Sequence, residues 1–132
     1  ENPHDKHAYA NLGSTLLYKK PKQAKEYLQK ALNIDPEHDI ALIELGKIDK
    51  SEGNTVAAQV KFRKAYDLYL KQWKTNSLPK YAYGWFATVA EELEENNFAK
   101  EIRASAPKTE SEAYYNKENL SMTKTKALTN NN

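Results

Sequence analysis

The sequence predicts an all-α fold built from stacked antiparallel helical hairpins, and three observations lead to this prediction. Apolar residues with helical spacing run up to Asp35-Pro36, stop there, and start again a few residues later with the same face. The apolar pattern then recurs with a period of 33 to 34 residues. Each break between helical segments carries Pro, Gly or Asn. A single long helix would not be interrupted in this way, whereas a chain of stacked hairpins would be.

The period is defined by small and large apolar residues at fixed positions. One set recurs after 34 residues, as Ala24, Leu28 and Ala31 followed by Ala58, Phe62 and Ala65. Another recurs after 33 residues, as Tyr9, Leu12 and Gly13 followed by Leu42, Leu45 and Gly46. The difference of one residue falls in the turn within each hairpin. A change of length is tolerated in a turn, but within a helix it would rotate the apolar face away.

The first repeat, residues 6–38, reads as two helices. Their apolar faces are Tyr9, Leu12, Gly13 and Leu16, and then Ala24, Tyr27, Leu28, Ala31 and Leu32. Pro21 suits the first turn of the second helix, because the N–H that it lacks has no partner there. Asp35 or Asp39 is expected to cap the helix that follows, with His38 solvated in the intervening turn.

The second repeat, residues 39–72, has the same plan. Its faces are Ala41, Leu42, Leu45, Gly46 and Ile48, and then, after a break at Gly53-Asn54, Ala58, Phe62, Ala65 and Tyr66. Helix-forming residues continue through Trp73, which predicts one long helix to about Lys74. The small residues are expected to let the two helices of each hairpin approach closely; they are Gly13, Ala24, Ala31, Gly46, Ala58 and Ala65.

These spacings resemble the tetratricopeptide repeat, whose unit reads W-x2-L-G-x2-Y, then A-x3-F, then P. The first repeat has Tyr9-x2-Leu12-Gly13-x2-Leu16, Ala24-x3-Leu28-x2-Ala31 and Pro36; the second has Leu42-x2-Leu45-Gly46-x2-Asp49 and Ala58-x3-Phe62-x2-Ala65. Leu70 stands where the second repeat would have its Pro. The resemblance covers about half of the chain and implies a short right-handed superhelix. The alternative is a general antiparallel bundle whose periodicity is accidental.

The rest of the chain departs from the repeat. Residues 78–106 are predicted to form a hairpin that caps the helical domain 6–106, with an apolar face of Ala82, Trp85, Phe86, Val89, Ala90 and Leu93. Ser77 is expected to cap its first helix, and Asn96-Asn97 to separate it from a short second helix that ends before Pro107. Residues 107–132 are polar, and a disordered or loosely docked tail is expected there.

Composition narrows the function classes. The chain has 132 residues, no cysteine, 39% hydrophobic residues and a formal net charge of +2. The lack of cysteine rules out disulfide scaffolds, zinc–thiolate sites and thiol catalysis. The net charge is too small to indicate a nucleic-acid partner, and no apolar run is long enough to span a membrane. No targeting segment is recognised, so the compartment stays open, with the cytoplasm favoured.

No catalytic or metal-binding pattern is evident. His4 and His7 have helical spacing, but no nearby residue completes a metal site. The acidic residues between Glu91 and Glu95 are interpreted as a solvated helix face. Glycine is too rare for a phosphate-binding loop. We therefore expect a non-enzymatic protein that uses neither a metal nor another cofactor.

The resemblance implies that the first helix of each repeat lines a groove that binds a peptide or partner helix. The residues predicted for that groove are His7, Ala10, Ser14, Leu17, Ile40, Ile43, Lys47 and Lys50. Ile40 and Ile43 are apolar beyond what the packing face needs, so either a partner or the chain's own third hairpin is expected to cover them. Ala10 and Ser14 stand where a clamp for chaperone C-termini would have Lys and Asn, so that clamp is absent. Lys47 and Lys50 still suit an acidic ligand.

The expected function is thus that of a protein-interaction module, an adaptor, scaffold or assembly factor with a protein or peptide partner. Two alternatives remain open. The chain could be a regulatory or scaffolding segment of a larger enzyme, or a structural unit that assembles with itself.

Overall fold

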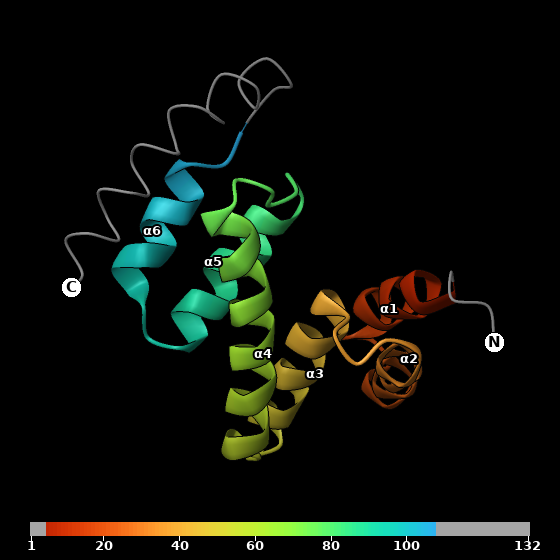
Figure 1. The fold of residues 1–132 in the computed structure, drawn as a ribbon. Coiled ribbons are helices and arrows are strands. Elements are labelled where there is room, and N and C mark those ends of the chain that lie inside the picture. The colour runs from red at the N-terminus through yellow and green to blue at the C-terminus, as the bar shows by residue number, and fades with distance from the viewer. Residues whose placement is uncertain (1–4, 108–132) are drawn as a thin grey trace. The chain divides into compact units, whose positions relative to one another are not determined.

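The computed structural model describes residues 5–107, and within this range it is all-helical, as predicted, with six helices and no strand. The helices are α1 (Asp5–Leu16), α2 (Pro21–Ile34), α3 (Asp39–Ser51), α4 (Thr55–Lys74), α5 (Ala82–Glu92) and α6 (Asn96–Ala104) (Figure 1). Contacts divide the chain into two compact units at Leu68/Tyr69, inside α4, and each unit is described by itself. Among the described helices, none combines the length and the apolar character that crossing a membrane requires.

In the first unit, α1 and α2 form a hairpin, and α3 packs against both of them. One core cluster joins the three helices through Ala10, Leu28, Ala31, Ala41 and Leu45, with Tyr9, Leu32 and Ile48 packed at its edge. Leu12, predicted to belong to the packing face of α1, is instead 46% exposed.

Two glycines bring the helices of the first unit close together. A Cβ at Gly13 would lie 2.5 Å from Cγ of Leu28, and a Cβ at Gly46 would lie 2.6 Å from Cε1 of Phe62. Real Cβ atoms do not approach that closely, so only glycine fits at these two positions without a shift of the neighbour. The expectation that these glycines permit close approach is confirmed, at equivalent positions of the two predicted repeats.

Three helices end in the same hydrogen-bonded arrangement. After α3, α4 and α5, the second residue beyond the helix, Gly53, Asn76 or Glu94, has a positive φ, of 84°, 55° and 65° respectively. The next residue donates its N–H to a carbonyl five residues back, as Asn54 to Asp49, Ser77 to Gln72 and Glu95 to Ala90. This is the Schellman motif, which satisfies carbonyls that the helix leaves without partners.

The second unit is held together by aromatic packing. Trp73, at the end of α4, meets Phe86 of α5 edge-on at 6.0 Å and Phe98 of α6 at 5.6 Å between ring centroids. Phe86 and Phe98 are themselves 5.5 Å apart in the same geometry, and α5 packs along α6. Edge-to-face pairs add to the stability that burial alone provides.

Some predicted boundaries are wrong. Asn96 and Asn97 begin α6; the break is at Leu93–Glu95, where the positive φ of Glu94 ends α5. Ser77 does not cap α5, which has Tyr81 at its N-cap position and no side-chain cap bond. The prediction that α4 continues to Lys74 is confirmed. The expected tail, apart from Pro107, lies outside the described residues.

Candidate functional site

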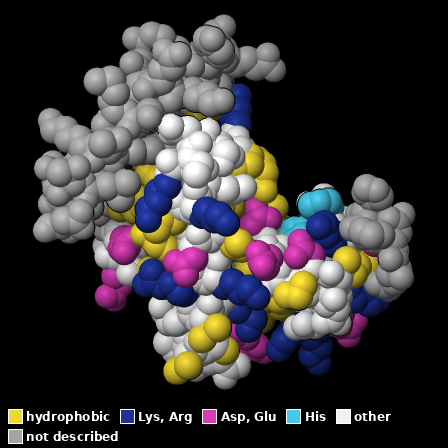
Figure 2. All heavy atoms as spheres, in the orientation of Figure 1, with side chains coloured by type: hydrophobic (Ala, Val, Ile, Leu, Met, Phe, Trp, Pro, Cys, Tyr) yellow, Lys and Arg dark blue, Asp and Glu magenta, His cyan; other side chains and the backbone are white. Residues whose placement is uncertain are grey.

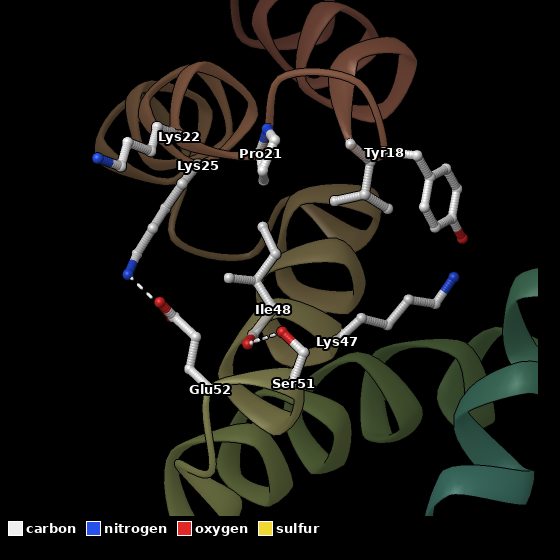
Figure 3. Close-up of a pocket in the computed structure, with 9 residues that line it drawn as sticks. Tyr18, Pro21, Lys22, Lys25, Lys47, Ile48, Ser51 and Glu52 are labelled. Carbon is white, nitrogen blue, oxygen red and sulfur yellow. Dashed lines mark hydrogen bonds and ion pairs between the residues drawn. The ribbon is translucent and has the colours of Figure 1, made fainter.

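A pocket of about 400 Å³ opens in the first unit, where the turn after α1 faces the C-terminal half of α3 (Figure 3). It is lined by Leu17 and Tyr18 from that turn, by Pro21, Lys22 and Lys25 from the start of α2, and by Lys47, Ile48, Ser51 and Glu52 from the end of α3. Its volume is within the range of about 300–1,000 Å³ that is usual for ligand pockets. We call it the turn pocket.

The turn pocket has an apolar interior and an aromatic rim. Leu17 and Ile48 are half-buried, and Pro21 closes one side above Ile48 (Figure 3). Tyr18 is 88% exposed, so its ring stands almost free in solvent. Exposed aromatic rings next to apolar pockets are typical anchors for binding partners, because they bury much surface at little cost in conformational entropy.

The charges around the turn pocket are mostly positive. Three lysines and one glutamate line it, which gives +2 formally. Lys25 is paired with Glu52 at 3.0 Å, and the ammonium of Lys47 lies 3.1 Å from Oε1 of Glu44. Lys22 is exposed, and Lys19 and Lys20 are exposed in the adjoining turn. The rim therefore favours acidic groups on a ligand.

Only part of the predicted groove belongs to this pocket. Leu17 and Lys47 line it, whereas the other predicted residues do not: His7, Ala10, Ser14, Ile40, Ile43 and Lys50. Ala10 and Ile43 are completely buried, and Ala10 belongs to the core cluster. They offer no surface to a ligand. His7 and Lys50 are exposed, and Ser14 and Ile40 are half-buried.

Ser14 and Lys47 are linked through a buried carboxylate that the sequence did not reveal. Glu44 of α3 is only 3% exposed; its Oε2 accepts a hydrogen bond from the Ser14 hydroxyl at 3.0 Å. Its Oε1 accepts no hydrogen bond, and the nearby ammonium of Lys47 balances its charge as an ion pair. A buried carboxylate that loses its cation is strongly destabilising, so Lys47 has a structural role as well.

His38 corrects two predictions. It is 4% exposed rather than solvated, and it takes the capping position of α3 expected for Asp35 or Asp39, since its Nδ1 accepts the N–H of Ala41 at 3.3 Å. Its Nε2 lies 3.2 Å from Nδ1 of His7 on α1. Burial is the main cause that lowers the pKa of His38 below its ordinary value. Histidine is an unusual N-cap, which is why the nearby Asp residues were the better prediction.

Most of the turn pocket was not predicted, because Tyr18 lies in a break between two predicted helices and Ile48 belongs to the predicted packing face of the second repeat. A signal was present in Tyr18-Lys19-Lys20-Pro21-Lys22, where an aromatic ring is surrounded by cations. That Ile48, Ser51 and Glu52 lie opposite this run depends on how α3 packs against α2, which periodicity does not specify.

No group of three metal-binding side chains comes together in residues 5–107. His4, the predicted neighbour of His7, lies outside the described residues.

Comparisons with protein-family models, curated proteins and solved structures gave no match.

Proposed function

We propose that this protein is a non-enzymatic interaction module, similar to tetratricopeptide-repeat proteins, and that its turn pocket binds an acidic peptide carrying one large apolar side chain. The observation that carries the proposal is the turn pocket itself, apolar within and surrounded by lysines, with Tyr18 exposed at its rim. The packing of α3 on both helices of the first hairpin and the equivalent roles of Gly13 and Gly46 support the resemblance.

The chemistry of the ligand follows from the lining. The apolar side chain would be desolvated against Leu17, Ile48 and Pro21, and the ring of Tyr18 would cover it. Carboxylates beside it would meet Lys22, and would compete with Glu52 for Lys25. Such charge pairs at a rim mainly raise the association rate and are screened by salt, so binding should weaken as ionic strength rises.

The test uses a fluorescein-labelled peptide in which Glu and Gly alternate around a central Trp, with binding followed by fluorescence anisotropy. Micromolar affinity is expected. Two control peptides separate the contributions, since Lys in place of Glu should abolish binding, and Gly in place of Trp should weaken it at least tenfold. Equal binding of all three peptides would contradict the proposed recognition.

Protein variants locate the site. Lys22→Glu and Tyr18→Ala should each weaken binding without lowering the melting temperature, because both side chains are exposed. Lys64→Glu makes the same charge change at an exposed position of α4 outside the pocket and should leave affinity nearly unchanged. Lys47→Glu is not a clean variant, because it removes the cation beside buried Glu44. If Lys22→Glu and Lys64→Glu behave alike, the turn pocket is not the binding site.

A further inference from the structure

Two histidines from different helices meet within the first unit. His7 is exposed on α1, and His38 is buried at the N-cap of α3. Their ring centroids are 5.1 Å apart, and Nε2 of His38 lies 3.2 Å from Nδ1 of His7. Histidine surface is visible as a small cyan patch in Figure 2. We call this pair, which is separate from the turn pocket, the His7–His38 contact.

The hydrogen bonds determine where the protons lie. Because Nδ1 of His38 accepts the N–H of Ala41, it carries no proton. Neutral His38 then carries its proton on Nε2 and donates it to Nδ1 of His7, which must in turn be unprotonated. His7 therefore carries its own proton on Nε2. This arrangement makes both hydrogen bonds only while both rings are neutral.

Adding one proton breaks part of this arrangement. A proton on Nδ1 of His38 would face the N–H of Ala41 and remove the cap of α3. A proton on Nδ1 of His7 would face the proton on Nε2 of His38. Moving the His38 proton from Nε2 to Nδ1 relieves that clash, but again removes the cap. No protonated form of the pair keeps both contacts.

Charged groups from three neighbouring segments surround the pair. Burial is the main cause that lowers the pKa of His38, and the positive charges of His7 and Lys6 on α1 lower it further. Asp39, whose Oδ1 is 3.8 Å from Nδ1 of His38, and Asp35, after α2, raise this pKa in opposition. Asp35 and Lys6 are themselves paired at 3.1 Å, so each weakens the influence of the other on His38. A protonated Nδ1 of His38 would turn to Asp39 in place of the N–H of Ala41.

We propose that the His7–His38 contact is a proton-sensitive link between α1 and the start of α3. It is intact when both rings are neutral and is weakened when either ring takes up a proton. The direction in which pH changes stability follows from His38. The pKa of His38 in the folded chain lies below 6.5, which is its ordinary value. As the pH falls below 6.5, the unfolded chain therefore binds more protons than the folded chain. The stability that neutral His38 contributes is fully present above pH 6.5, and it is lost as the pH falls toward the lower pKa of folded His38.

The first test reads the tautomers directly by ¹⁵N NMR of the imidazole nitrogens in the full chain at about pH 8, where histidine is ordinarily neutral. We expect unprotonated Nδ1 and protonated Nε2 on both His7 and His38. A protonated Nδ1 on His38 at this pH would overturn the proposal, because the capping bond and the contact could not then coexist.

The second test measures amide hydrogen exchange in α1 and at the start of α3 between about pH 8 and about pH 5, corrected for intrinsic exchange rates. Protection should fall with acid by up to about tenfold per pH unit, the limit for one linked proton. His38→Asn keeps a capping side chain but does not titrate, so its protection should no longer depend on pH in this way. If His38→Asn and the parent chain lose protection equally with acid, the His7–His38 contact is not proton-sensitive and the proposal is wrong.

Discussion

At the scale of single residues, close packing outweighs helix propensity. Gly46 lies inside α3, where glycine is an unfavourable residue by about 1 kcal/mol relative to alanine. It is nevertheless required, because a methyl group there would overlap the ring of Phe62, which is completely buried. The sequence thus accepts a weaker helix in order to bring α3 and α4 together.

Gly46→Ala should therefore destabilise the protein, although alanine is the better helix former. We expect the overlap with Phe62 to cost about 1–3 kcal/mol, more than the gain in propensity. Gly84→Ala is the matched control: Gly84 lies within α5 with nothing within 4 Å of the added Cβ, so stability should rise by about 0.5–1 kcal/mol. Urea unfolding of both variants checks this, and a stabilising Gly46→Ala would show that the helices have room to separate.

At the scale of elements, the three Schellman motifs have residues of decreasing suitability at the position of positive φ. Gly53 adopts this conformation without strain, and Asn76 tolerates it. Glu94 has neither advantage, since its side chain crowds the backbone in the left-handed region. The turn between α5 and α6 is consequently the most strained of the three.

Glu94→Gly should stabilise the protein by about 1 kcal/mol, because it removes the left-handed strain. Glu94→Ala deletes the same carboxylate but keeps a Cβ, and it should leave stability nearly unchanged. Thermal unfolding of the two variants separates backbone strain from side-chain charge. If both raise the melting temperature equally, repulsion among the acidic residues of this segment is the cause instead.

At the scale of the whole molecule, residues 5–107 contain the described core of each unit. Removal of 108–132 is predicted to change the free energy of unfolding by less than about 1 kcal/mol, because that sequence is mostly polar and its large apolar residues are few: Tyr114, Tyr115, Leu120, Met122 and Leu128. Circular dichroism and chemical unfolding of the shortened chain check this. A larger loss would mean that the tail docks on the helices, and Tyr114→Ala with Tyr115→Ala in the full chain should then reproduce it.

Local patterns were sufficient to predict the helices, the long α4 and the close contacts of Gly13 and Gly46. Helical periodicity and the small residues of a hairpin can be recognised because both are encoded within a few turns of chain. The repeat family and the function remain predictions. The burial of His38 and Glu44 was not predictable in the same way. His38 meets His7 across 31 positions of sequence and Glu44 meets Ser14 across 30, through helix packing that no local pattern specifies. The turn pocket likewise exists only because α3 brings Ile48 and Glu52 opposite Tyr18 and Lys22, so its charge and shape are properties of the packed helices.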